Sequence, residues 1–267
     1  MSILASGSAL NLIGPGNLLV AIRSYCDGSK TSHMSLAGFS APDDFWSDLE
    51  QGWKVLLADR TPSAPYIHMT DIVAAQKPFT EENGWTEDKR LALVNHAANF
   101  LSHKDKSAFH GFSCVVDCAA RERLIKQGAS IAEPHKICSE VCLGAMMEWI
   151  AHKYVAFSES EPIAVETMDF FFDQGEPFRA HFEKYARIGK KKKQLIWSLV
   201  NTIAPADMKL TPGLQVADML AWSGTRKHSR GERTFKHLFD NLGKVVPITY
   251  AEIGEEQLRK KGFRTAI

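Results

Sequence analysis

The sequence predicts an α/β protein in which a mixed central sheet is flanked by helices. Three observations lead to this fold class. Short runs of β-branched and aromatic residues end near glycines, longer runs carry apolar residues three and four positions apart, and the two kinds alternate along the 267 residues. No linker divides the chain, so we expect one domain over residues 1–267. Within it we expect a helical insertion at about 120–160 and a peripheral C-terminal tail at about 243–267.

In the first half of the chain, two strands over residues 18–26 and 33–40 are expected to form a hairpin around the turn Asp27-Gly28-Ser29. Residues 42–53 begin with Pro-Asp-Asp and then carry apolar residues at helical spacing, which predicts a helix. The pattern then predicts a short strand at 66–69, an amphipathic helix at 86–102 and another strand at 109–117.

In the second half, residues 125–134 predict a loop, and residues 136–157 predict a long, largely buried helix. Residues 163–172 predict a central strand that delivers Asp173 into a glycine turn. A helix over 176–188 is expected to end at Gly189, residues 195–203 predict a further strand, and Pro212-Gly213 begins a helix.

The composition is that of an ordinary globular protein, with 45% hydrophobic and 24% charged residues and a net charge of +1. No overall charge therefore names a partner. Five cysteines, an odd number, do not resemble a secreted disulfide framework and fit a reducing cytosol. Gly14-Pro15-Gly16 interrupts the N-terminal apolar stretch, which has no basic start. We therefore expect a cytoplasmic protein without a membrane span.

Four aspartates form the main functional pattern. Asp27 and Asp173 each follow an apolar strand candidate, Asp71 follows the third one, and Asp218 lies inside an apolar helix. Taken singly, an aspartate is most often a helix cap or a turn former. Carboxylates that converge repel one another unless a cation neutralises them, and such hard oxygen ligands suit Mg²⁺ or Mn²⁺. Two such ions can clamp both oxygens of a phosphodiester displacement.

The order of the segments "SYCDGS", "HMTD", "FFFDQGEP" and "GLQVADMLAW" resembles the bacterial and phage proteins grouped as domain of unknown function 3800 (DUF3800), in the ribonuclease H-like superfamily. The resemblance spans roughly residues 18–227, and "LQVAD" at 214–218 is its most specific part. It implies a ribonuclease H-like mixed sheet. It further implies that Asp27 is the first-strand acid, Asp173 the later-strand acid and Asp218 the helix acid, with Asp71 as a fourth member.

One position departs from that family. Its first motif commonly reads Asp-Glu-Ser, whereas Gly28-Ser29 follows Asp27 here, so a neighbouring carboxylate is absent. The leading hypothesis is a metal-dependent nuclease or related phosphoryl-transfer enzyme that activates water. Asp27, Asp71, Asp173 and Asp218 would be catalytic, and all but Asp71 would hold one or two Mg²⁺ or Mn²⁺ ions. The alternative is a nucleic-acid- or protein-binding module of the same fold that has lost catalysis.

Two basic concentrations suggest contacts with a nucleic-acid backbone, DNA or RNA. The candidate residues are Lys190, Lys191, Lys192, Lys193, Arg226, Lys227, Arg230 and Arg233. Lysines after a helix end more often form a solvated loop. Trp222 could stack on a base or fill the core, and His68 could assist proton transfer or make a strand-end hydrogen bond.

A third hypothesis is a structural zinc site. Two pairs of cysteines, each with three residues between its members, lie near His110 and His135 in the sequence. The pairs are Cys114 with Cys118 and Cys138 with Cys142. Free cysteines are also common as small buried hydrophobic residues, and the knuckle spacing typical of zinc sites is absent.

Overall fold

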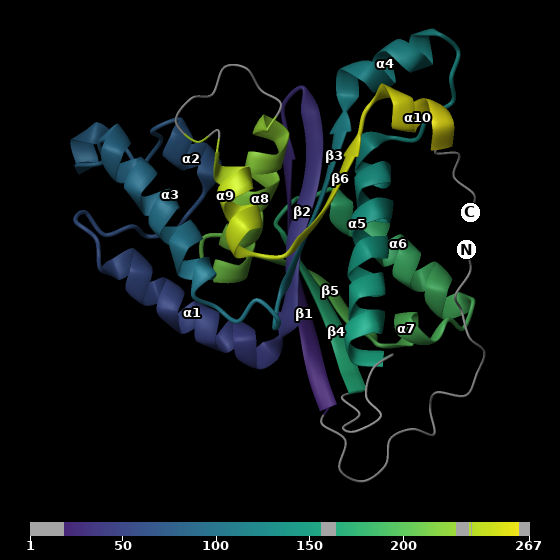
Figure 1. Cartoon of the computed structure of the whole chain (residues 1–267), viewed down its shortest axis with the longest axis horizontal. Helices are drawn as coiled ribbons and strands as arrows, with labels where there is room; N and C mark the ends of the chain where they lie inside the picture. The colour runs from purple at the N-terminus through teal and green to yellow at the C-terminus, as the bar shows by residue number, and fades with distance from the viewer. Residues whose placement is uncertain (1–18, 156–163, 228–234, 236, 262–267) are drawn as a thin grey trace.

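Six strands form one mixed sheet at the centre of the molecule (Figure 1). The computed structural model describes residues 19–155, 164–227, 235 and 237–261. The strand order is β5-β4-β1-β2-β3-β6, with β2 antiparallel to both of its neighbours and the other pairs parallel. The strands are β1 (Leu19–Lys30), β2 (His33–Pro42), β3 (His110–Asp117), β4 (Ala164–Asp173), β5 (Val200–Ala206) and β6 (Ile248–Ile253). The predicted α/β class with a mixed central sheet is confirmed.

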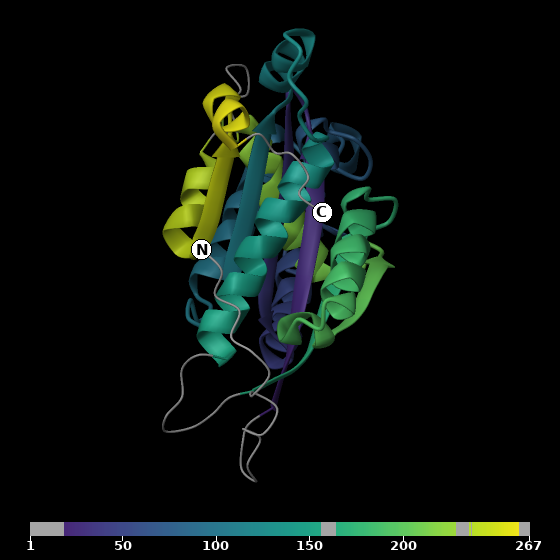
Figure 2. The same cartoon turned by 90° about the vertical axis from the view of Figure 1, so that its right-hand side faces the viewer.

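Helices cover both faces of this sheet, as Figures 1 and 2 show. The first face carries α1 (Asp43–Ala58), α2 (Met69–Val73), α3 (Glu87–Ser102), α8 (Pro212–Arg226) and α9 (Leu238–Val245). The second carries α4 (Cys118–Lys126), α5 (Pro134–Ile150), α6 (Phe178–Lys191), α7 (Leu195–Ser198) and α10 (Glu255–Lys261). Two single turns complete the helices, η2 (Glu81–Asn83) and the π-type η3 (Ala151–Val155). Each face of the sheet is thus buried under a layer of helices.

The alternation of side chains along the strands decides which face each residue joins. On β1, Ile22 and Cys26 enter the core beneath α5 and α6, whereas Tyr25 enters the core beneath α8. Asp27 lies two positions after Tyr25 and therefore points to the α8 face. On β4, Phe172 joins the α5 layer, so Asp173 points to the α8 face as well.

Helix α8 lies closely against the sheet. Its residues from Pro212 to Thr225 are all buried. A Cβ at Gly213 would collide with the ring of Tyr25, so this glycine permits the close approach. Tyr25 in turn stacks on Phe171, with 5.3 Å between the ring centroids. This contact places the second turn of α8, with Asp218, directly over β1.

The predicted turn at 27–29 is wrong, because β1 continues through it to Lys30. Asp27 pairs with Ala37 of β2, and the chain reverses at Thr31 and Ser32. Position 28 suits a glycine, because Phe178 and Glu176 occupy the space that a side chain there would need. Asp27 is therefore a strand residue and not a turn former.

The strand predicted at 66–69 is also wrong, since helix α2 begins at Met69 and no ladder forms before it. The amide of Ile67 donates to Oε1 of Gln215 at 2.9 Å, and the amide of Met69 donates to Oδ2 of Asp218 at 2.6 Å. Side chains of α8 thus replace the neighbouring strand as hydrogen-bond partners.

Two elements differ from expectation in the second half. Helix α6 continues past Gly189 to Lys191, and this glycine serves packing, because the ring of Trp197 lies where a Cβ of Gly189 would stand. The strand expected at 195–203 is split into α7 and β5. After residue 243, β6 pairs with β3 at the edge of the sheet. The remaining predicted helices and strands are present within a few residues, as far as the described residues extend.

Candidate functional site

Strands β1 and β4 and helix α8 bring together three of the aspartates found in the sequence. In the parallel pairing of β1 with β4, Cys26 lies beside Phe172. The acids that follow these two residues, Asp27 and Asp173, therefore lie at the same level of adjacent strands. Asp218 reaches the same place from α8. Three acids separated by up to 191 positions in the chain thus share one location.

The carboxyl groups of Asp27 and Asp218 lie close enough for each to act on the pKa of the other. Burial raises the pKa of Asp27, and the nearby charges of Asp218 and Glu176 raise it further. Burial also raises the pKa of Asp218, to about 6, although His68 and the amide of Met69 act in the opposite direction. In the metal-free protein, burial therefore favours the protonated form of both acids.

Glu176 is a fourth acid at this site. Its charge acts on Asp27, and its own pKa is raised from 4.5 to about 7 by burial, Asp173 and Asp218. The turn after β4 positions it, because Gly175 has a φ of +86° and the amide of Glu176 donates to the carbonyl of Asp173 at 3.2 Å. The sequence pattern did not single out Glu176, although a glycine between two acids in "DQGE" is a signal for such a turn.

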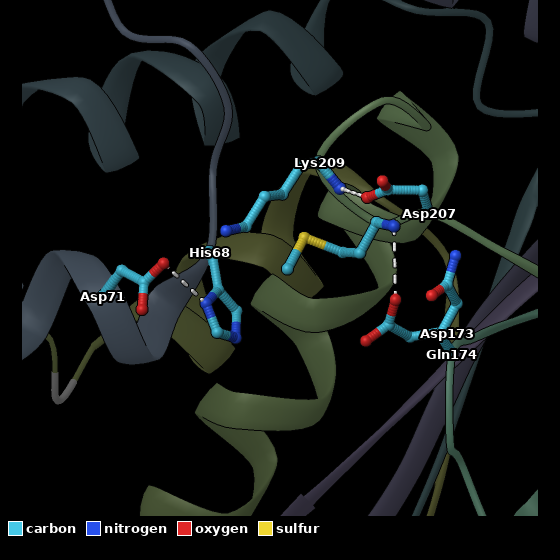
Figure 3. Close-up of a pocket in the computed structure, with 7 residues that line it drawn as sticks. His68, Asp71, Asp173, Gln174, Asp207 and Lys209 are labelled. Carbon is cyan, nitrogen blue, oxygen red and sulfur yellow. Dashed lines mark hydrogen bonds and ion pairs between the residues drawn. The ribbon is translucent and has the colours of Figure 1, made fainter. Parts of the chain in front are cut away.

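An open pocket of about 370 Å³ adjoins the acids. It is lined by His68, Asp71, Asp173, Gln174, Asp207, Met208 and Lys209. Figure 3 shows His68 and Asp71 on one side of it and Asp173 on the other. Oδ1 of Asp173 accepts a hydrogen bond from the amide of Met208 at 3.2 Å. The pocket therefore gives solvent and solutes access to the carboxylate of Asp173.

Asp71 lies on the wall opposite Asp173 and is engaged by its own neighbours. The hydroxyl of Tyr66 donates to its Oδ2 at 3.0 Å, and Nδ1 of His68 lies 3.0 Å from the same oxygen. The carboxyl groups that perturb Asp27 are those of Asp218, Glu176 and Asp173. Asp71 thus orients His68 across the pocket, and His68 in turn acts on Asp218.

Gln215 holds the loops of this site against α8. Its Oε1 accepts hydrogen bonds from Nε1 of Trp53 at 2.8 Å and from the amide of Ile67. Its Nε2 donates to the carbonyls of Met208 and Lys209, each at 3.2 Å. The buried amide is fully hydrogen-bonded and joins both walls of the pocket. Gln215 belongs to the "LQVAD" motif of the sequence, but the sequence does not reveal which groups its amide bonds.

The first basic cluster, Lys190 to Lys193, lies at the far end of α6 from Glu176. A helix of 14 residues is about 21 Å long. Nζ of Lys190 donates to the carbonyl of Val200 at 2.6 Å. The structure therefore does not bring these lysines to the acids.

The second basic cluster is described only in part. Arg226 and Lys227 lie at the end of α8, about 12 Å along the helix from Asp218. Arg226 stacks on Trp222, which fills the core, and Nζ of Lys227 lies 4.4 Å from the ring centroid of Tyr250. Arg230 and Arg233 lie outside the described residues. Lys209, which the sequence did not suggest, is the lysine that lines the pocket.

Two of the cysteines, Cys138 and Cys142, are buried thiols that donate hydrogen bonds. Sγ of Cys142 donates to the carbonyl of Leu36 at 3.3 Å, and Sγ of Cys138 donates to the carbonyls of Met34 and Cys114. Burial raises the pKa of Cys138 and of Cys142, which keeps both protonated. Cys138 and Cys142 thus point toward backbone carbonyls, as buried thiols in a packed core do.

Across residues 19–155, 164–227, 235 and 237–261, no three histidine, cysteine, aspartate or glutamate side chains already stand at metal-ligand positions. The acid cluster nevertheless matches a hard divalent cation in chemistry. Its donors are all carboxylate oxygens, and Oε2 of Glu176 is buried with no hydrogen-bond donor among the described residues. Asp173 and Asp218 instead accept from backbone amides. To surround an ion, these side chains would have to leave the positions that they have here.

Comparison with known proteins adds one likeness. No protein-family model and no curated protein matches the chain. Among solved structures, the chain is similar to the crystal structure of Bst-RNase HIII in complex with Mn²⁺, with 11% sequence identity and a TM-score of 0.33. The match covers 86% of this chain and 71% of that one. At this TM-score the likeness carries no argument about function.

None of the helices in the described part of the chain combines the length and the apolar character that crossing a membrane requires.

Proposed function

We propose that this protein is a divalent-metal-dependent nuclease or a related phosphoryl-transfer enzyme. The observation that carries the proposal is the convergence of Asp27, Asp173 and Asp218 from β1, β4 and α8 beside an open polar pocket. Acids from separate elements are costly to bury together without a partner, so their meeting calls for a cation. The resemblance of "SYCDGS", "FFFDQGEP" and "GLQVADMLAW" to DUF3800 proteins of the ribonuclease H-like superfamily supports the same reading.

In this proposal, Asp27, Asp173 and Asp218 hold one or two Mg²⁺ or Mn²⁺ ions. Such ions, when bound, activate water and stabilise charge on a phosphodiester. Asp173 faces the pocket, so it lies between the solvent and the buried pair of Asp27 and Asp218.

The other pocket residues would handle the substrate and its protons. His68, oriented by Asp71, can accept or deliver a proton at its Nε2 atom on the pocket side. Lys209 can contact a phosphate oxygen. The basic residues at 190–193, 226–227, 230 and 233 would contact backbone phosphates farther from the scissile bond, on DNA or RNA.

The test is cleavage of labelled DNA, RNA and hybrid duplexes with Mn²⁺, comparing the wild type with Asp27→Asn. We expect the substitution to reduce cleavage by at least about 100-fold, because it removes a charged ligand at the centre of the cluster. Asp48→Asn, an exposed aspartate on α1, is the matched control and should cleave as the wild type does. Equal rates for Asp27→Asn and the wild type would remove Asp27 from the mechanism.

A second candidate is a binding module that keeps the fold without catalysis. It is favoured by Gly28, which stands where the resembling family commonly has a glutamate. This candidate predicts that the protein binds nucleic acid but takes up no Mn²⁺ in a calorimetric titration. Uptake of Mn²⁺ together with cleavage would exclude it.

A further inference from the structure

We infer that the protein binds a single strand of nucleic acid along β5, from the pocket beside Asp173 to a second groove between β5 and α6. This inference rests on the proposed function for the class of ligand, and it adds where the ligand lies and that it is single-stranded. Three features carry it: the groove itself, the strand that joins it to the pocket, and the basic side chains at both ends.

The second groove is open and has a volume of about 380 Å³. Helix α6 contributes Ala186, Arg187 and Lys190 to its lining, and β5 contributes Val200, Asn201 and Ile203. Ala186 and Val200 are buried, whereas Arg187 and Lys190 are exposed. Apolar contacts are therefore available inside the groove and basic groups at its rim. Such a lining suits the apolar face of a base together with its phosphate.

Strand β5 connects this groove to the pocket. Residues 200, 201 and 203 line the groove, and Asp207, Met208 and Lys209, directly after the end of β5, line the pocket. From residue 201 to residue 207 the chain covers about 20 Å at roughly 3.3 Å per residue. An extended strand of about 4 nucleotides, the size of the smallest single-strand sites, can span this distance.

The position of β5 leaves the way between the two openings clear. It is the edge strand of the described sheet and lies beside α6 (Figure 2). The groove lies on the α6 face of the sheet, and Asp173 points to the α8 face. A ligand that occupies both openings therefore passes around the outer edge of β5, which a flexible single strand can follow and a stiff duplex cannot.

The same edge is closed to a protein strand. The carbonyl of Val200 already accepts a hydrogen bond from Nζ of Lys190 at 2.6 Å, and Pro205 has no amide hydrogen to donate. Addition of a β-strand depends on such backbone groups. A ligand held by side chains, as a polynucleotide is, does not need them.

Both ends of this path carry cations. Lys209 lines the pocket, and Arg187 lines the groove together with the first residue of the basic cluster Lys190 to Lys193. Glu183 also lines the groove, but it lies 3.7 Å from Arg179, which offsets its charge. Phosphates along the path thus meet basic groups at either end. The basic cluster on α6, which lies far from the acids, gains a role at the distal end of the ligand.

The experiment measures the binding of fluorescein-labelled oligothymidylates to the full-length protein by fluorescence anisotropy, in a chelator that prevents cleavage. We expect the affinity to rise with length and to level off only beyond about 4 nucleotides, when the strand reaches both openings. Arg187→Gln should weaken binding of a strand of about 12 nucleotides several-fold and lower the slope of log affinity against log salt by about 0.7. Lys209→Gln, at the other end, should do the same.

Arg123→Gln is the matched control. Arg123 is exposed on α4 and lines neither opening, so its loss removes the same charge and should leave the affinity unchanged. A thymidine–adenosine duplex of equal length should bind more weakly than the single strand. Polyglutamate of equal charge should not displace the oligonucleotide at equal concentration.

The outcomes separate this inference from the proposed function. If Arg187→Gln and Arg123→Gln bind alike, or if duplex or polyglutamate binds as well as the single strand, the path along β5 is refuted. Cleavage by the wild type with unchanged binding by Arg187→Gln refutes the path and leaves the nuclease standing. Loss of binding in Arg187→Gln, in a protein that cleaves nothing with Mn²⁺, supports the path and refutes the nuclease.

Discussion

Asp27 shows how the meaning of a residue changes with its neighbours. Burying a carboxyl group on a strand is unfavourable, and the charges of Asp218, Glu176 and Asp173 also act on Asp27. Burial and these charges act in the same direction, so the metal-free protein stores repulsion at this point. The acid–base state of the cluster therefore affects the stability of the whole fold.

We predict that this repulsion makes the metal-free protein less stable as the pH rises. The pKa of Glu176 is raised from 4.5 to about 7, so the folded state binds its proton more tightly than the unfolded state does. The stability that this proton confers is fully present below about pH 4.5 and is lost between there and about pH 7. The measurement is urea unfolding of the wild type and Glu176→Gln across this range, in the presence of a chelator.

Glu176→Gln should therefore become more stable than the wild type as the pH rises, and the gap should stop growing above about pH 7. Removing the charge of Glu176 also relieves Asp27, which adds to the gap with the same sign. The exposed Glu183→Gln variant should show no such pH-dependent gap. A constant difference between the wild type and Glu176→Gln would contradict the prediction.

At the scale of elements, α8 is the helix that organises the site. It supplies Asp218, and Gln215 on the same helix holds the 66–69 segment, the 208–209 loop and α1 together. One residue thus determines how the two walls of the pocket are spaced. The segments that line the pocket are held in place by side-chain hydrogen bonds rather than by pairing with a neighbouring strand.

We predict that Gln215→Leu destabilises the protein by about 2–4 kcal/mol, because it leaves Nε1 of Trp53 and the amide of Ile67 buried without an acceptor. The measurement is the free energy of unfolding from urea titrations. Gln174→Leu, at an exposed position of the pocket, is the control and should change stability by less than about 0.5 kcal/mol. When Gln215→Leu is combined with Trp53→Phe, the total loss of stability should be smaller than the sum of the two single losses, because both substitutions remove the same hydrogen bond.

The sequence predicted most elements because their patterns are local. The helical spacing from residue 86 to 102 and the apolar strands at 109–117 and 163–172 required no knowledge of distant residues. The segment at 66–69 could not be predicted, because its amides bond to side chains about 150 positions away. Gly189 was interpreted as a helix end, whereas it serves the approach of Trp197.

The same limit applies to the candidate site. Asp27, Asp173 and Asp218 could be proposed from the sequence because each interrupts an apolar pattern. Glu176 could not, since its position depends on the space left by Gly28 on another strand. The basic clusters were suggested by local composition alone. Composition does not show how far a basic side chain lies from acids on other elements.

At the scale of the whole molecule, β1 and β2 are shared by both core layers. Tyr25 and Phe39 point into the layer beneath α8, and Ile22 and Leu36 point into the layer beneath α5. Loss of either layer would expose one complete face of the central sheet to water. The two layers therefore stabilise each other through the strands between them.

We predict that the two layers unfold together in one cooperative transition, because both depend on β1 and β2. The measurement uses a variant in which Trp149 and Trp197 are replaced by phenylalanine, which leaves the remaining four tryptophans, all in the layer beneath α8, as reporters. Their fluorescence should change at the same urea concentration as the far-ultraviolet circular dichroism of the whole molecule. Two separate midpoints would mean that the layers unfold independently.

The different burial of the five cysteines allows one of them to be labelled selectively. Cys26, Cys114, Cys138 and Cys142 are buried, and Cys118 at the start of α4 is half-buried. A maleimide dye added under native conditions would therefore attach first at Cys118. A fluorophore there sits on the face of the sheet opposite α8, so binding can be followed without altering the acids or the pocket.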